Sequence, residues 1–193
     1  GGANVGNYVA KITLNNANYV WSDGDENLTK EFNYSIVKSD VTFSNLEIEG
    51  WTYGGTASVP TVSTSFACDV YYLYPDKANG TYSATVPTNA GTYYVKAVTD
   101  GNGNLNKSES TPVEFTIAKA SATISGYESS YTKTYDSTEF VFTDKNITSS
   151  DGVALTYSYT LNGGNVSAIK NAGTYSVVIT LPESDNYLGD SVT

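Results

Sequence analysis

A five-residue pattern, Asn-x-Gly-x-Tyr, occurs three times along this chain. It begins at Asn4, Asn89 and Asn171, so its spacings are 85 and 82 residues (89 − 4 and 171 − 89). This period is the size of a small domain and exceeds the roughly 20–50 residues of solenoid repeats. We therefore predict that the chain builds the same domain-sized unit more than once.

Two further patterns recur at nearly the same spacing. Tyr34–Lys38 is matched by Phe115–Lys119, 81 residues later (115 − 34). Trp51–Thr56 is matched by Lys133–Thr138, 82 residues later (133 − 51). Because three separate motifs share one period, we interpret the chain as a tandem repeat of about 82 residues.

The motifs divide the chain into three segments. Residues 1–37 correspond to the C-terminal part of a preceding unit, residues 38–119 to a complete unit, and residues 120–193 to a unit without its last strand. Gly1-Gly2-Ala3 looks like an internal cut. The chain is thus expected either to be a piece of a longer one or to pair residues 1–37 with another molecule's last unit. No flexible linker follows Lys119, which should restrict bending between units.

Each unit is expected to be all-β. Tyr alone accounts for 17 residues, and β-branched and aromatic residues favour strands whereas Asn and Gly favour turns. Lys96 should face water, so Tyr93, Val95 and Ala97 should face inward with a period of two. The same reasoning predicts two further inward faces: Tyr8, Ala10, Ile12 and Leu14, and Tyr175, Val177, Ile179 and Leu181.

The pattern around Tyr93 is more specific. Asn89, Gly91, Tyr93 and Val95 have the offsets of the sixth strand of immunoglobulin domains, in which a Tyr hydroxyl bonds to nearby backbone in a tyrosine corner. Val95 stands where those domains have a Cys, so the core should lack a disulfide. We predict tandem immunoglobulin-like β-sandwich repeats with hydrogen-bonded corner tyrosines.

The middle segment also resembles a known family. Its motifs in order are Gly50–Thr56, Pro60, Tyr82–Tyr93 and Phe115–Ala120. Together they are similar to the MBG-type immunoglobulin-like repeats of bacterial surface proteins. The resemblance implies a secreted or wall-attached protein, often of Gram-positive bacteria, whose repeats separate a functional tip from the cell. The last segment departs from the pattern, with Lys133 in place of the Trp and no closing strand.

Several residue types are absent. The chain has no His, Met, Arg or Gln, and Cys68 is its one cysteine. Without His there is no ready general base near pH 7 and no imidazole metal ligand. One cysteine forms neither an internal disulfide nor a multi-cysteine zinc site, and we expect Cys68 to act as a small buried hydrophobe. We therefore expect neither an enzyme nor a cofactor.

The chain is strongly acidic, with 10 basic and 20 acidic residues and a formal charge of −10. Such a surface repels phosphate backbones and anionic lipid, so contact with nucleic acid is disfavoured. No run of about 18 apolar residues exists, so direct membrane insertion is not expected from these residues.

Two loops are calcium candidates because oxygen-bearing side chains alternate in them. One carries Asp100, Asn102 and Asn104, but Leu105 and Thr111 stand where a calcium loop needs Gly and a bidentate carboxylate. The other carries Asp23 and Asp25. The alternative for both is a plain solvated loop. A Lys–Asn isopeptide bond is a further open alternative, since both residue types and acids are present.

Trp51 and Tyr53 are the best ligand candidates. On a strand both would point to one side and could stack on a sugar ring. The alternative is packing in the core or at a domain junction. Two functions follow: a structural spacer in an extracellular stalk, possibly of an adhesin, or a module that binds a polysaccharide or host glycoprotein. In both, the neighbouring repeats of the same polypeptide are partners.

Overall fold

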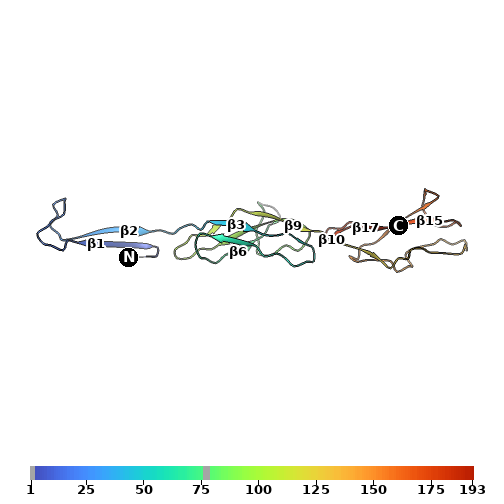
Figure 1. Ribbon diagram of the computed structural model, residues 1–193, viewed down its shortest axis with the longest axis horizontal. Coiled ribbons are helices and arrows are strands. Elements are labelled where there is room, and N and C mark those ends of the chain that lie inside the picture. The colour runs from blue at the N-terminus through green and yellow to red at the C-terminus, as the bar shows by residue number, and fades with distance from the viewer. Residues whose placement is uncertain (1–2, 76–78) are drawn as a thin grey trace. The chain divides into compact units, whose positions relative to one another are not determined.

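Every regular element of the described chain is a β-strand, which confirms the all-β prediction (Figure 1). The computed structural model describes residues 3–75 and 79–193. Gly1 and Gly2, part of the expected internal cut, lie outside them. The described part holds no helix able to span a membrane. The strands are β1 (Gly6–Thr13), β2 (Thr29–Ile36), β3 (Phe43–Glu47), β4 (Trp51–Thr52), β5 (Thr61–Thr64), β6 (Tyr71–Leu73), β7 (Gly91–Thr99), β8 (Ser108–Glu109), β9 (Val113–Ala118), β10 (Ala120–Ser121), β11 (Ile124–Ser125), β12 (Thr148–Ser149), β13 (Thr156–Leu161), β14 (Gly164–Val166), β15 (Tyr175–Leu181), β16 (Tyr187–Leu188) and β17 (Asp190–Val192).

The contacts group the chain into two compact units. Unit 1 comprises residues 1–48, 60–85 and 94–113, and unit 2 comprises residues 49–59, 86–93 and 114–193. These units differ from the three segments proposed from the motifs, whose boundaries remain a prediction. We refer to residues 1–37, 38–119 and 120–193 as the N-terminal, middle and C-terminal segments.

Unit 1 contains a long hairpin and part of a larger sheet. β1 and β2 pair antiparallel over their full length, from Gly6 opposite Ile36 to Thr13 opposite Thr29. β3 pairs with β5, and β7 pairs with both β6 and β8. The predicted inward positions Val95 and Ala97 of β7 are fully buried. The prediction that Lys96 faces water is wrong, because only 13% of its side chain is exposed and it pairs with Glu109 at 2.7 Å. Val41, Val98 and Leu105 of this unit are also buried.

Strands β7 and β9 each contribute residues to both units. The sheet that contains them has the order β4-β9-β7-β6, with β8 also paired to β7. Within unit 2, β9 runs parallel to β4, with Trp51 opposite Ile117 and Thr52 opposite Ala118. Phe115 and Ile117 of β9 are buried and Thr116 between them is exposed, as a half-buried strand requires.

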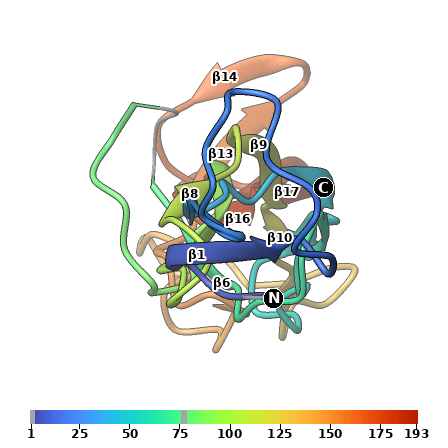
Figure 2. The same ribbon diagram turned by 90° about the vertical axis from the view of Figure 1, so that its left-hand side faces the viewer.

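The rest of unit 2 is built on a four-stranded sheet of order β14-β13-β15-β17. A tight turn at Asn162-Gly163, both with positive φ, joins β13 to the edge strand β14 (Figure 2). Two buried residues of β15, Ile179 and Leu181, pack with Ala122 and Ile124. Phe142 packs beside this core against the rings of Tyr131, Tyr157 and Tyr159.

One predicted inward face is not buried. Tyr8 and Ala10 of β1 lie opposite Tyr34 and Phe32 of β2, so the apolar residues do share one face of the hairpin. However, Ile12 is 51% exposed and Phe32 is 48% exposed. The physical reason is that β1 and β2 pair only with each other among the described residues, as a two-stranded sheet. The apolar residues therefore share one face as predicted, but within residues 3–75 and 79–193 no further strand pairs with this hairpin.

Candidate functional site

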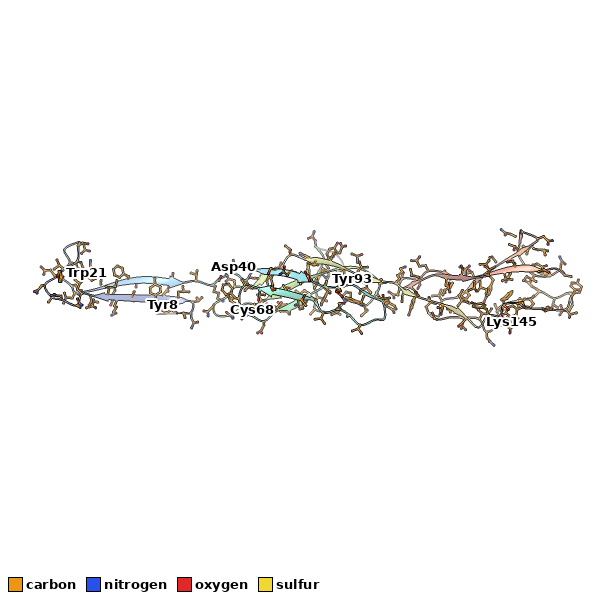
Figure 3. All side chains as sticks on the ribbon, viewed as in Figure 1. Tyr8, Trp21, Asp40, Cys68, Tyr93 and Lys145 are labelled. Atoms are coloured by element: carbon orange, nitrogen blue, oxygen red, sulfur yellow. The ribbon has the colours of Figure 1, made fainter. Side chains whose placement is uncertain are left out.

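Three tyrosines make the same local hydrogen bond. The hydroxyls of Tyr8, Tyr93 and Tyr175 donate to the backbone carbonyls of Asn4, Asn89 and Asn171, at 2.6, 3.0 and 3.0 Å. Each bond spans four residues and closes the loop that leads into the strand. The prediction of hydrogen-bonded corner tyrosines is therefore confirmed for Tyr93 and Tyr175, and Tyr8 makes the same bond without having been predicted. Tyr8 on β1 and Tyr93 on β7 are labelled in Figure 3.

The first of these corners is also bound by an asparagine from far along the chain. The backbone N–H of Val5 donates to Asn104 Oδ1 at 2.8 Å, and Asn104 Nδ2 donates to Asn4 Oδ1 at 3.0 Å. Asn4 and Val5 belong to the N-terminal segment and Asn104 to the middle segment, and all three lie in unit 1. One amide side chain thus satisfies a backbone donor and a side-chain acceptor together.

The second corner makes the same contacts in unit 2. The backbone N–H of Ala90 donates to Asn186 Oδ1 at 2.8 Å, and Asn186 Nδ2 donates to Asn89 Oδ1 at 3.4 Å. Asn186 lies 82 residues after Asn104 (186 − 104). We call each such pair of contacts an asparagine junction: Asn4, Val5 and Asn104 form the first, and Asn89, Ala90 and Asn186 the second.

Backbone pairing accompanies both junctions. The N–H of Ser39 donates to the carbonyl of Asn104 at 3.1 Å, and the N–H of Ala120 donates to the carbonyl of Asn186 at 2.9 Å. A parallel bridge joins Ser39 to Leu105, and the short parallel pair β10–β16 joins Ala120 to Tyr187. In the middle and in the C-terminal segment alike, the first residues therefore pair with the loop of the same segment that carries the junction asparagine, and the register is equivalent.

A lysine makes an equivalent contact near each asparagine junction. Lys38 Nζ donates to the backbone carbonyl of Asn102 at 2.7 Å, and Lys119 Nζ donates to that of Ser184 at 2.6 Å. The two spacings are 81 and 82 residues (119 − 38 and 184 − 102). Lys119 also forms an ion pair of 2.7 Å with Glu183. Since the carboxylate of Glu183 is exposed, this ion pair contributes little to stability.

The two predicted ligand residues, Trp51 and Tyr53, pack on different partners. Trp51 stacks on Phe115 with ring centroids 5.2 Å apart. Tyr53 meets the edge of Tyr187, next to Asn186, at 5.3 Å. Both side chains are half-buried. Trp51 thus packs on the strand β9, and Tyr53 packs beside the second asparagine junction. Packing in the core or at a domain junction is the alternative to ligand binding given above for these two residues.

The calcium candidates have partners of their own. Asp23 pairs with Lys30, and hydrogen bonds from Lys30 and from the backbone N–H of Asp25 hold the pKa of Asp23 below its ordinary value. Asp100 accepts a hydrogen bond from the Tyr71 hydroxyl at 2.9 Å. Asn102 Oδ1 accepts backbone N–H groups of its own loop. Among residues 3–75 and 79–193, no three acidic or cysteine side chains form a cluster able to hold a metal.

Cys68 and Asn104, both singled out in the sequence, can be placed, and so can Trp21, the other tryptophan of the chain. Cys68, between β5 and β6, is half-buried and unpaired, less enclosed than a small core residue (Figure 3). Trp21 lies in the loop that joins β1 to β2, where its indole N–H donates to the carbonyl of Asn27 at 2.6 Å. Asn104, considered as a calcium ligand, instead uses its side chain in the first asparagine junction.

The asparagine junctions were not predicted from the sequence. A signal was present, because Asn104 and Asn186 share the 82-residue period and Lys38 and Lys119 end the recurring strand motif. What the sequence lacks is the partner: Val5 and Ala90 contribute a backbone N–H, which no residue pattern marks.

Comparison of the chain with protein-family models, with curated proteins and with solved structures finds no match.

Proposed function

We propose that this chain consists of tandem immunoglobulin-like repeats and serves as the stalk of an extracellular, secreted or wall-attached bacterial surface protein. In this role the repeats separate a functional tip, as in an adhesin, from the cell. The function is mechanical, so it requires folded units and well-defined connections between them. It requires no catalytic group and no cofactor.

The observation that carries the proposal is the recurrence of the asparagine junction. Asn104 and Asn186 make the same pair of contacts, each with a tyrosine-corner loop of the preceding segment. Lys38 and Lys119 make equivalent bonds to the carbonyls of Asn102 and Ser184. A connection that recurs with the period of the sequence is what a stalk of identical steps needs.

The chain path at the second junction favours a stiff connection. β9 ends at Ala118 and β10 begins at Ala120, so Lys119 alone joins the two strands. Both strands are anchored, β9 by pairing with β4 and β10 by pairing with β16. Each intramolecular hydrogen bond contributes only ~1 kcal/mol, but several act on a connection that has almost no free residues.

The alternative is a module that binds a polysaccharide or host glycoprotein through Trp51 and Tyr53. It receives less support, because Trp51 stacks on Phe115 and Tyr53 packs on Tyr187. These contacts use ring surface that a sugar would need. The charge of −10 also argues against nucleic acid as a partner in either role.

The two functions can be separated by a binding survey. The whole chain is tested against a broad panel of glycans and host-matrix proteins, beside Trp51→Ala and the matched variant Trp21→Ala, which alters the only other tryptophan. A stalk predicts no saturable binding by any of the three. Saturable binding that Trp51→Ala abolishes and Trp21→Ala retains would replace the stalk by an adhesive module.

A further inference from the structure

Six Asn-x-Ser/Thr triplets occur in the chain, and in each the middle residue is not proline. They begin at Asn27, Asn33, Asn79, Asn106, Asn146 and Asn165. Glycosyltransferases attach sugars to the side-chain amide of the Asn in such triplets, on surface loops of secreted proteins. Because Asn, Ser and Thr are all abundant in this sequence, the triplets alone do not identify a site. The structure distinguishes them by what holds each Asn and its neighbours.

Three of the triplets are held by the fold. Asn33 lies in β2 and Asn165 lies in β14, so the backbone of both is paired with a neighbouring strand. Asn106 is half-buried, and its Nδ2 donates to Asp40 Oδ1 at 2.8 Å. A transferase would have to separate paired strands or break this bond before it reached the amide. These three positions are therefore poor acceptors.

The triplet at Asn146 is anchored after its first residue. Ile147 packs against the core of unit 2, and Thr148 pairs with Ser125 between β11 and β12. Drawing this triplet into an enzyme would disturb that core. The triplet at Asn79 directly follows the residues that the structure does not describe.

Asn27 is exposed and lies in the loop that joins β1 to β2, close to Trp21, which Figure 3 labels. Its backbone N–H donates to Asp25 Oδ1 at 2.9 Å, and its carbonyl accepts the Trp21 indole N–H at 2.6 Å. Its Oδ1 accepts the backbone N–H of Thr29, the third residue of the triplet, at 3.1 Å. Within residues 3–75 and 79–193, Nδ2 is thus the hydrogen-bonding group of Asn27 that has no partner.

The free Nδ2 is the atom that glycosylation uses. The bond from Thr29 N–H to Oδ1 draws electron density toward the oxygen, which eases the loss of a proton from Nδ2. Leu28, the middle residue, is exposed. Thr29 Oγ1 shares a 3.0 Å hydrogen bond with Thr13 Oγ1, but a hydroxyl has one donor and two acceptor positions. The Thr29 hydroxyl therefore keeps the capacity to bind an enzyme.

We propose that Asn27 is an acceptor site for N-linked glycosylation by a transferase that uses a glycosyl diphosphate donor. In the transfer, a bond forms between Asn27 Nδ2 and the anomeric carbon of the sugar, and the bond from that carbon to the phosphate oxygen of the donor breaks. Nδ2 loses one proton to a base of the enzyme, and the diphosphate leaves with the electron pair of the broken bond. Since the site depends only on this loop, it stands whether or not the protein is a stalk.

The test uses the folded full chain and two transferases, each first shown to modify a synthetic peptide with the sequence of residues 23–31. One is a soluble asparagine glucosyltransferase with UDP-glucose, and the other is an oligosaccharyltransferase with a lipid-linked oligosaccharide. Mass spectrometry of proteolytic peptides locates the sugar and gives the rate at each triplet. We expect at least one enzyme to modify Asn27, at least ~10-fold faster than Asn33, Asn106 and Asn165, where hydrogen bonds must first break. The enzyme that succeeds identifies the donor.

Two matched variants separate recognition from folding. Thr29→Ala and Thr13→Ala both remove the bond between the two hydroxyls, but only Thr29→Ala removes the hydroxyl of the triplet. We expect Thr29→Ala to abolish the modification and Thr13→Ala to retain it. An unmodified Asn27 in the folded chain, with enzymes that modify the peptide, would overturn the proposal, and so would equal modification of the two variants. Failure of the stalk function would leave these results unchanged.

Discussion

Asn186 accepts a 2.8 Å hydrogen bond from the backbone N–H of Ala90, 96 residues earlier in the chain. The first asparagine junction repeats this bond between Asn104 and Val5, across 99 residues. Such bonds connect loops that no local interaction would bring together. They give the connection between segments a defined register. The parallel pairing of Ala120 with Tyr187 and of Ser39 with Leu105 has the same equivalence between the two junctions.

Removing the junction side chain should destabilise unit 2. Asn186→Ala leaves the partly buried N–H of Ala90 without its acceptor, and we expect a loss of about 1 kcal/mol in the free energy of unfolding. Chemical denaturation measures this loss, and hydrogen exchange should be faster at Ala90. Asn165→Ala, at an exposed position of β14, is the control and should change the stability little. Equal stabilities of the two variants would contradict the role assigned to Asn186.

The corner tyrosines should contribute through their hydroxyls. Tyr93→Phe keeps the ring and removes the 3.0 Å bond to the carbonyl of Asn89, so we expect a cost of about 1 kcal/mol. Tyr175→Phe should behave in the same way through Asn171. Thermal unfolding gives the comparison, with Tyr135→Phe, which is largely exposed, as the neutral control. A Tyr93→Phe chain as stable as the control would show that the hydroxyl bond adds nothing.

Asp136 should titrate at unusually low pH. Hydrogen bonds from the side chain and the backbone N–H of Thr138, followed by one from Lys133, lower the pKa of Asp136 from its ordinary 3.8 to about 2. Because the folded-state pKa is the lower one, ionised Asp136 stabilises its turn fully above the ordinary pKa. That contribution is lost as the pH falls through about 2.

An NMR titration of the Asp136 carboxyl carbon measures this pKa directly. Asp136→Asn is the matched variant, and in it the amide of Thr138 should no longer respond to pH between about 4 and 2. A midpoint at the ordinary value of 3.8 in the wild-type chain would contradict the hydrogen-bonded turn.

Trp51 should act as a packing residue. Its ring stacks on Phe115, so Trp51→Ala should lower the free energy of unfolding by about 2 kcal/mol, less than the ~3–5 kcal/mol typical of a fully buried Trp. Denaturant unfolding is the measurement, and Val59→Ala, at a highly exposed position, is the control. If Trp51→Ala is as stable as the control, the ring is free to serve a ligand instead.

The sequence predicted those features whose causes are local. The tyrosine corner is set by the five residues from Asn89 to Tyr93, and the shared inward face of Val95 and Ala97 follows from the pleat of a strand. The partners of distant residues could not be predicted in this way. The alternation of Asp100, Asn102 and Asn104 along the sequence suggests calcium ligands, whereas the hydrogen-bond partners of the Asn104 side chain are the distant residues Asn4 and Val5.

Burial was the other quantity that the pattern did not determine. Ile12 and Phe32 lie on the apolar face of the β1–β2 hairpin, as Val95 and Ala97 do on that of β7, yet both are about half exposed. A pattern indicates which face of a strand is apolar, whereas burial requires a second layer on that face.

The most direct test of the stalk proposal is the width of a distance distribution across the second asparagine junction. Nitroxide labels are placed at Thr116→Cys and Ser158→Cys, both exposed positions of unit 2, in a Cys68→Ser background, and pulsed electron spin resonance measures their separation. A stalk with a fixed junction predicts one narrow distribution, which broadens when Asn186→Ala and Lys119→Ala are combined. A wild-type distribution as broad as that of the double variant would contradict the account, because the junction would then not restrain the segments that it joins.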